Sequence, residues 1–367
     1  MADGSASGAV VTIRVVQWAT GAVGRAQLRE IVDRADLELV GLFVYDPAKV
    51  GVDAGALVGR PATGIAATND KAAILALDAD LVLHAASKAF PENTNTDDIV
   101  ALLASGKNVI TTTSYNHLPT FGADADSRIR HACEQAGTRF HAGGEHPGFM
   151  FERLATSLTA LSQRVDRITV QEYVDCSGVS GKEMLVDLMG MGKRPEDITT
   201  ESPMFRAVSV QYEQAIGATA DVLGLELDEI RHSVETGTSP RDVEVACGTL
   251  PAGTVVGQIM SWTGYRDGAP VLVAQEYWTV TDDIPGWDLD LEQTFLVRVT
   301  VDGSPSLRVD LTIGNETIGD LDGTSGGQLA VAMTAIRAIP FVLRSPPGVV
   351  TPPVFGAYQW PDATAPT

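Results

Sequence analysis

The turn after the first apolar segment is the feature of this sequence that most clearly predicts chemistry. Residues Val11–Arg25 read VTIRVVQWATGAVGR, a strand-like run followed by a glycine-containing turn and a helical pattern. Gly21 lacks a Cβ, so a pyrophosphate can approach the backbone, and Gly24 lets the helix pack closely on the strand. The N-terminus of that helix offers N–H groups and partial positive charge. We therefore expect a dinucleotide to contact Thr20, Gly21, Ala22, Val23, Gly24 and Arg25, although Ala19 stands where a first glycine is usual.

The residues that follow the next apolar run bear on which dinucleotide is bound. Asp46 lies 25 positions after Gly21, where a carboxylate can accept a hydrogen bond from a ribose 2′-hydroxyl and so favours NAD. Lys49 and Arg25 are near enough in sequence to neutralise a 2′-phosphate, which favours NADP. Asp46 also precedes Pro47, where it can serve as an ordinary turn residue. The sequence leaves NAD and NADP open as cofactors.

Two further groups of polar side chains follow apolar strand-like runs. Tyr115 and His117 come after NVITT, and both residue types can donate a proton to an atom that accepts a hydride. Glu145 and His146 come after RFHA and form a candidate acid–base pair. Structural alternatives exist for each group: Tyr115 can pack, His117 can cap its loop, and Glu145 can favour the dipole of a following helix. We predict all four as candidate catalytic residues.

The elements that must position these residues alternate between strand and helix from residue 11 to about 148. Strand-like runs such as LVLHA are continuously apolar, as expected of strands buried on both faces. Regular alternation predicts an α/β fold with a doubly wound parallel sheet of the Rossmann type. Ligands of such sheets bind beyond the carboxyl ends of the strands, where all the candidate residues above fall.

The second half of the chain has longer strands with alternating polarity. We expect a strand over 244–250, among others, and a hairpin turn at Asp302-Gly303. This pattern predicts an α+β domain with a mostly antiparallel sheet. The predicted boundaries are a dinucleotide-binding Rossmann domain over 9–148, a substrate and dimerisation domain over 149–324, a helix over 325–345 that returns to the first domain, and a proline-rich tail over 346–367.

Composition narrows the possible partners. The formal net charge of −21 repels phosphate backbones and so argues against nucleic acid and anionic membranes. No run of eighteen apolar residues predicts a membrane span, and the start MADGSASGA has no signal-peptide pattern. Three distant cysteines without metal-binding spacing predict free thiols, no metal site and a cytoplasmic location. The expected partner is a small-molecule substrate.

Six segments in a fixed order extend the argument beyond the glycine turn. WATGAVGR, FVYDPAKVG, DLVLHA, NVITTT, GEHPGFMFERL and DLMGMGKRPED together resemble the dihydrodipicolinate-reductase-like oxidoreductases. The resemblance is closer to the branch that holds 2,4-diaminopentanoate dehydrogenase and the native amine dehydrogenases. It implies interconversion of a carbonyl plus ammonia with an amine through NAD(P)H, usually by a homodimer. It also places His84 and Ala85 along the nicotinamide side of the cofactor, and His146, often Asn or His in that branch, near nicotinamide and substrate.

One departure from that branch concerns the loop after NVITT. The branch typically carries a glutamate there that activates ammonia, whereas this chain reads Thr111-Thr112-Thr113-Ser114-Tyr115-Asn116-His117. Either the task has moved, for instance to Glu145, or the chain does not carry out reductive amination. An ammonia-independent ketone or imine reductase, and a nucleotide-binding protein without catalysis, therefore remain alternatives to an amine dehydrogenase.

Overall fold

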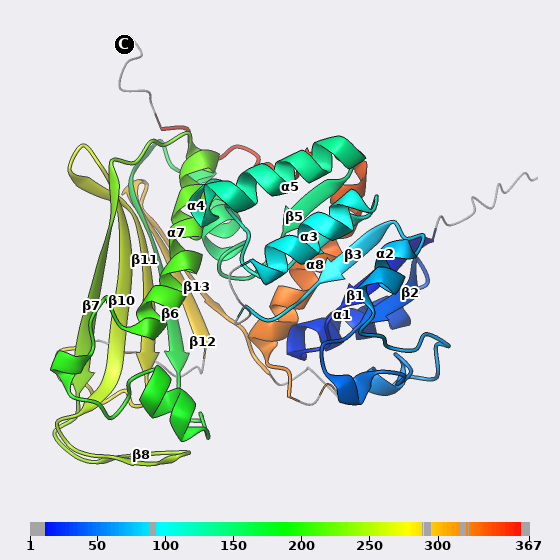
Figure 1. Ribbon diagram of the computed structural model, residues 1–367. Helices are drawn as coiled ribbons and strands as arrows, with labels where there is room; N and C mark the ends of the chain where they lie inside the picture. Colours follow the sequence, from blue (N-terminus) through cyan, green and yellow to red (C-terminus); the bar gives the residue numbers. More distant parts are fainter. Residues whose placement is uncertain are drawn as a thin grey trace, which may run out of the picture. The chain divides into compact units, whose positions relative to one another are not determined.

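A computed structural model describes residues 12–88, 93–287, 289, 295–315, 321 and 323–360 (Figure 1). The chain forms two compact units. The first unit comprises Met1–Glu145 and Asn315–Pro352, and the second comprises His146–Gly314 and Pro353–Thr367. The chain thus passes from the first unit to the second, back to the first and again to the second. The functions that the sequence assigns to its domains stay a prediction.

The first unit is built on a parallel sheet with the strand order β14-β5-β4-β3-β1-β2. Its strands are short and mostly buried, which agrees with the continuous apolar runs of the sequence. The order reverses next to β1, so β1 and β3 flank the point where a doubly wound sheet binds its ligand. The strands are β1 (Ile13–Trp18), β2 (Leu37–Phe43), β3 (Leu81–His84), β4 (Asn108–Thr111), β5 (Arg139–Ala142) and β14 (Gly348–Val349).

Helices cover both faces of this sheet, which confirms the doubly wound arrangement. Helices α3 and α5 pack on one face, where Val82, Val109 and Phe140 are buried. Helices α1 and α8 pack on the other, where Leu83 and Ile110 are buried. The helices are α1 (Ala22–Asp33), α2 (Lys71–Ala76), α3 (Thr94–Ala104), α4 (Leu118–Phe121), α5 (Ala123–Ala136) and α8 (Gly326–Arg344), with short 3₁₀ turns at Pro47–Lys49 and Ala56–Val58.

Helix α8 is long and apolar enough to cross a membrane when judged by length and composition. In the structure its buried residues, among them Ile336 and Ile339, pack into the core of the first unit. Arg337 interrupts the apolar run. The apolar face of α8 is therefore buried against the sheet of the first unit.

The second unit holds a six-stranded sheet with the order β13-β12-β6-β11-β10-β7. Among the described strands of this sheet, β11 and β6 are the one parallel pair, so the sheet is mostly antiparallel, as predicted. Helix α7 (Pro203–Leu223) contacts β10 and β11 across one face. The strands are β6 (Arg164–Asp175), β7 (Glu229–Thr238), β10 (Val255–Arg266), β11 (Ala269–Thr279), β12 (Phe295–Ser304) and β13 (Leu307–Thr312).

Several local predictions for the second unit are wrong. The strand expected over 244–250 is a small hairpin of β8 (Val243–Val245) and β9 (Gly248–Leu250). Asp302 and Gly303 lie inside β12, and the chain reverses two residues later, around Pro305. Strand β7 was not predicted, because its exposed polar residues conceal the strand period. Two segments are π-helices, Met150–Ala155 and Glu183–Leu188; a short helix α6 (Thr156–Leu158) and 3₁₀ turns at Thr159–Leu161 and Pro195–Asp197 complete the unit.

Candidate functional site

The turn between β1 and α1 has the geometry that the glycine pattern predicts. Ala19 adopts a φ of 75°, the left-handed backbone conformation that normally selects glycine, so it is a genuine substitute for the missing first glycine. A Cβ on Gly24 would lie 2.3 Å from the carbonyl oxygen of Ala19. The buried side-chain amide of Gln17 on β1 donates to that same oxygen at 3.0 Å and so helps to hold the turn in place. Residue 24 must be glycine for α1 to pack this closely on β1.

The mouth of this turn fits a dinucleotide. Gly21 is exposed, and nothing lies within 4 Å of the position that a Cβ would take. Among the residues that the structure describes, no side chain caps the N-terminus of α1, and the first turn of α1 carries no acidic residue. The backbone N–H groups at Ala22 and Val23 therefore remain available to an anion, with the helix dipole in their favour. Residues Thr20–Arg25 are the group that would hold the pyrophosphate.

The residues after β2 are held in place by local hydrogen bonds. One carboxylate oxygen of Asp46 accepts a hydrogen bond from the Ala48 amide at 3.0 Å, so Asp46 begins the 3₁₀ turn. The Lys49 ammonium donates to the carbonyl and hydroxyl oxygens of Thr20, each at 3.2 Å. Lys49 thus reaches the glycine turn across 29 positions of sequence, whereas Asp46 has taken the turn role that the sequence left open. A carboxylate and an ammonium group thus both lie in the segment after β2, the features that favour NAD and NADP respectively.

The end of β3 is buried. The His84 side chain has no exposed surface, and its Nδ1 lies 2.9 Å from the hydroxyl of Thr111. Burial lowers the pKa of His84 to about 3, so the ring is neutral at physiological pH. Ala85 donates its N–H to the carbonyl of Trp18, which ties β3 to β1 immediately before the glycine turn. The ring of His84 is therefore part of the buried core of the first unit. Contact of His84 and Ala85 with the cofactor stays a prediction.

The loop after β4 places its two candidate residues in structural roles. Tyr115 is buried, its ring lies 4.3 Å from the ring of Phe121, and its hydroxyl is 2.8 Å from that of Thr96. Burial raises the pKa of Tyr115. His117 is half-buried, precedes α4 as its cap residue, and has Nδ1 2.7 Å from the Thr120 hydroxyl. Tyr115 thus packs in the core and His117 caps its loop, the structural alternatives that the sequence left open for these two residues.

Glu145 and His146 are neighbours in sequence but belong to different units. Glu145 is buried and ends the first stretch of the first unit. His146 begins the second unit, and its Nδ1 lies 2.8 Å from a carboxylate oxygen of Glu172 on β6. Tyr212 of α7 donates its hydroxyl to the same oxygen at 3.3 Å and meets the imidazole edge-on, with ring centroids 4.7 Å apart. The His146 side chain is fully buried in this arrangement.

A second buried carboxyl group interacts electrostatically with the same imidazole. Glu152, in the first π-helix, accepts the Gly148 N–H at 2.9 Å. It is buried, and burial raises its pKa while the nearby His146 lowers it. We call His146, Glu152, Glu172 and Tyr212 the histidine cluster. It combines an imidazole, two carboxyl groups and a phenol, the groups that enzymes use to store and move protons.

Sequence reasoning found only His146 in this cluster. One signal for Glu172 was available: it follows Ile168 and Val170 at a spacing of two, so a carboxylate stands on the buried face of β6. Glu276 repeats this on β11, after Leu272 and Ala274, and is the register partner of Glu172. Among the residues that the structure describes, no three His, Cys, Asp or Glu side chains gather as metal ligands.

Comparison with known proteins shows the family to which the chain belongs. Residues 149–355 match the family model of the 2,4-diaminopentanoate dehydrogenase C-terminal domain. This match spans more than half of the chain, so the chain belongs to that family. It covers most of the second unit, including the histidine cluster except its first member.

Individual relatives extend the similarity over both units. An amine dehydrogenase from Streptomyces virginiae is 28% identical over 343 residues, which cover 92% of this chain and 94% of the relative. The solved amine dehydrogenase from Mycobacterium smegmatis superposes with a TM-score of 0.67 at 19% identity, covering 92% of this chain and 94% of the other. A probable dehydrogenase from Thermotoga maritima gives a TM-score of 0.53 at 14% identity, covering 92% and 91%.

The fold and these similarities define the class of protein. The chain is an NAD(P)-dependent oxidoreductase of the amine-dehydrogenase-like class, with a Rossmann-type unit that fits the dinucleotide. The resemblance inferred from the six sequence segments is thereby confirmed. The roles of the individual site residues stay predictions.

Proposed function

We propose that the protein interconverts a small carbonyl compound plus ammonia with the corresponding primary amine. In the reducing direction, carbonyl, ammonia, NAD(P)H and one proton give the amine, NAD(P)⁺ and water. The bound cofactor supplies or accepts the hydride. The chain's own residues must hold the dinucleotide, orient the carbon that receives the hydride, and deliver and remove protons.

The observation that carries this proposal is the bond between His146 and Glu172. A carboxylate that holds Nδ1–H of an imidazole fixes the tautomer, so Nε2 becomes the ring atom that takes up or releases a proton. Both condensation with ammonia and loss of water require such transfers. In this proposal His146 takes over the proton handling that the missing loop glutamate performs in the resembled branch, and Glu172 positions it.

The dinucleotide would be held by the first unit. Thr20–Arg25 offer the uncapped helix end to the pyrophosphate, and Lys49 braces this turn through Thr20. Asp46 and Lys49 are the groups that would meet the adenosine ribose or its phosphate. His84, Tyr115 and His117 serve mainly to shape the strand ends, because their hydrogen bonds are made within the first unit.

The decisive experiment follows NADPH and NADH oxidation at 340 nm over a panel of ketones and aldehydes, with and without ammonium. Oxidation that requires ammonium, with the amine detected as product, supports the proposal. Oxidation that is independent of ammonium contradicts it and leaves a carbonyl reductase. If nucleotide binds tightly by calorimetry but nothing turns over, a binding protein without catalysis is the better description.

Assembly and location are further parts of the proposal. We propose a cytoplasmic homodimer formed through the second-unit sheet, with no nucleic-acid or membrane partner. The face of that sheet opposite α7 carries hydrogen-bonded polar side chains, with Gln171 donating to Gln275 at 2.8 Å and to Tyr277 at 3.1 Å. Tyr277 also stacks on Tyr173 at 4.3 Å. Light scattering that gave a monomer mass would contradict the dimer.

A further inference from the structure

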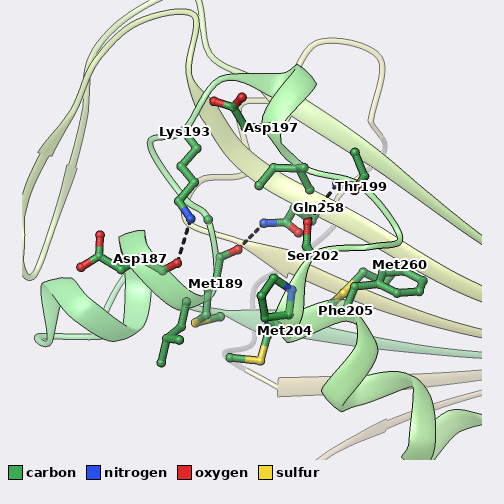
Figure 2. A pocket seen from close by; sticks show the side chains of 14 residues that line it. Asp187, Met189, Lys193, Asp197, Thr199, Ser202, Met204, Phe205, Gln258 and Met260 are labelled. Atoms are coloured by element: carbon green, nitrogen blue, oxygen red, sulfur yellow. Dashed lines mark hydrogen bonds between the residues drawn. The ribbon is translucent and has the colours of Figure 1, made fainter.

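The second unit contains a cavity that is too small for a dinucleotide. Its volume is about 110 Å³, whereas pockets that bind small organic molecules usually measure about 300–1,000 Å³. Figure 2 shows that its wall combines methionine side chains with charged ones, among them Asp187 and Lys193. The Lys193 ammonium donates to the Asp187 backbone carbonyl at 2.8 Å, so this charged group bonds within the wall. The cavity therefore does not compete with the β1–α1 turn as the site of the dinucleotide.

Two peptide groups of the β1–α1 turn are held by side chains from outside the turn. The Ala19 carbonyl oxygen accepts a hydrogen bond from the side-chain amide of Gln17 at 3.0 Å. The carbonyl and hydroxyl oxygens of Thr20 both accept from the Lys49 ammonium at 3.2 Å. The C=O and N–H groups of a trans peptide point in opposite directions. A bond that holds a carbonyl on one side of the turn therefore points the N–H of the next residue to the other side.

The N–H groups whose direction is set in this way belong to Thr20 and Gly21. Among the described residues, no backbone carbonyl accepts a hydrogen bond from either group. The N–H groups of Ala22 and Val23 are directed by the first turn of α1, whereas those of Thr20 and Gly21 depend on the conformation of the loop. Backbone N–H groups at such a loop and helix end are the donors that bind phosphate.

Ala19 needs external support more than a glycine would. Its φ of 75° is a conformation that alanine disfavours and that glycine adopts freely. The hydrogen bond from Gln17 stabilises this conformation and fixes the plane of the peptide that follows it. Gln17 thus compensates for the absence of a glycine at position 19.

The buried amide of Gln17 is costly to the fold. Gln17 and Gln27 are both fully buried, and Gln17 donates to the side-chain carbonyl of Gln27 at 3.2 Å. The side-chain oxygen of Gln17 and the side-chain nitrogen of Gln27 have no hydrogen-bond partner among the described residues. Unpartnered polar atoms in a core destabilise the folded state, and an apolar side chain of similar size avoids that cost. Core packing therefore does not account for an amide at position 17, whereas the bond to the Ala19 carbonyl does.

We propose that Gln17 and Lys49 are positioning residues for the dinucleotide, which set two peptide planes so that the N–H groups of the turn face the pyrophosphate. Lys49 also keeps a positive charge beside the turn, since both of its acceptors there are neutral oxygens. This role differs from contact with an adenosine 2′-phosphate, because NADH and NADPH share the pyrophosphate. The inference rests on the part of the proposed function that places the dinucleotide at this turn, and it does not depend on the substrate.

The first test measures NADPH binding to the full chain and to its Gln17→Met variant by calorimetry. The dissociation constant should rise about five- to tenfold, as expected for one hydrogen bond, while the melting temperature without nucleotide stays the same or rises. Gln27→Met is the matched control, because it also removes a fully buried amide but leaves the Ala19 carbonyl its donor. Its affinity for NADPH should be unchanged. Equal losses of affinity in the two variants would overturn the role of Gln17.

Ala19→Gly supplies a rescue that a merely structural role of Gln17 would not produce. Glycine adopts a positive φ without support, so Gln17→Met should weaken NADPH binding much less in the Ala19→Gly background than in the natural one. The same loss in both backgrounds would show that Gln17 does not act through residue 19, and the proposal would be wrong.

Lys49→Met separates the two roles open to this lysine. A positioning role predicts the same loss of affinity for NADH and NADPH, about tenfold or more for a hydrogen bond from a charged group. A loss confined to NADPH would indicate contact with the 2′-phosphate and contradict the positioning role. If the natural protein binds neither nucleotide, the proposed function and this inference both fail. If it binds them and the variants bind equally well, only this inference fails.

Discussion

The β1–α1 turn and the histidine cluster solve two chemical tasks by different means. The turn is made of residues that are consecutive in sequence, and its chemistry lies in the backbone, in a positive φ at Ala19 and a close approach at Gly24. The cluster is made of side chains, and His146 meets partners 26 and 66 positions away, Glu172 and Tyr212. The turn is a local sequence motif, whereas the cluster is assembled by the tertiary structure. Local sequence therefore reveals where a cofactor binds more readily than which side chains move protons.

The largest expected effect comes from removing the imidazole. His146→Ala should lower kcat by about 10²–10⁴-fold, the usual contribution of a general acid–base group, while nucleotide affinity stays unchanged. Steady-state kinetics and calorimetric titration of NADPH check this. His146→Asn is the sharper companion, because Asn can still donate to Glu172 but cannot shuttle a proton. Full activity in His146→Asn would show that residue 146 only donates a hydrogen bond.

Glu172→Gln should have the next largest effect. A hydrogen bond to a charged group contributes about 1.5–3 kcal/mol, so kcat should fall roughly 10- to 150-fold. Because Glu172 acts through His146, the pH profile of kcat/KM should also shift, with the pKa of the essential base moving down when the negative charge is lost. A loss of activity with an unchanged pH profile would indicate a structural role only. Tyr212→Phe is the companion variant, because it keeps the ring and removes only the hydroxyl that donates to Glu172.

Gly24→Ala tests the turn. The added methyl group would meet the Ala19 carbonyl at 2.3 Å, so α1 must move away from β1. We expect the free energy of unfolding to fall by about 1–3 kcal/mol and NADPH binding to weaken. Urea denaturation and nucleotide titration measure both. Gly327→Ala, in helix α8 of the same unit, supplies the comparison, because the nearest atom to the added Cβ is the Ser325 hydroxyl at 4.0 Å and the backbone there has no positive φ.

Glu152→Gln should leave the stability of the protein unchanged at low pH and raise it at high pH. Burial raises the pKa of Glu152 above its ordinary value of 4.5, so its stabilising contribution is complete below pH 4.5 and is lost as pH rises through the raised pKa. Glutamine keeps the acceptor for Gly148 and does not titrate. The variant should match the natural protein at pH 4 and melt a few degrees higher at pH 8. Equal melting temperatures at both pH values would contradict this.

Ala19→Gly should have the smallest effect. Glycine relieves the strain of a positive φ, worth about 1 kcal/mol, but adds a comparable entropy to the unfolded chain. The net change in the free energy of unfolding should be under about 1 kcal/mol, with nucleotide affinity retained. A loss of binding would show that the methyl group of Ala19 contributes to the site. Thermal unfolding with and without NADPH distinguishes these outcomes.

The same contrast explains how much could be predicted. The parallel sheet and its ligand turn follow from apolar runs and glycine spacing, which report local geometry directly. The hairpin expected at Asp302-Gly303 failed because antiparallel pairing with β6 carries β12 past that dipeptide. Glu172 was missed because its partner His146 is distant in sequence, and nothing local to either residue specifies that they meet. Buried carboxylates on otherwise apolar strand faces, such as Glu172 and Glu276, are the signal to look for.

The threefold passage of the chain between its units has a consequence for synthesis. Helix α8 and strand β14 complete the first sheet, yet they leave the ribosome only after the whole sheet of the second unit. Until then Leu83 and Ile110 lack the cover that α8 gives them, and β14 does not yet pair with β5. Incomplete sheets of this kind aggregate readily. A truncation before α8 therefore removes part of the first unit and leaves its sheet incomplete.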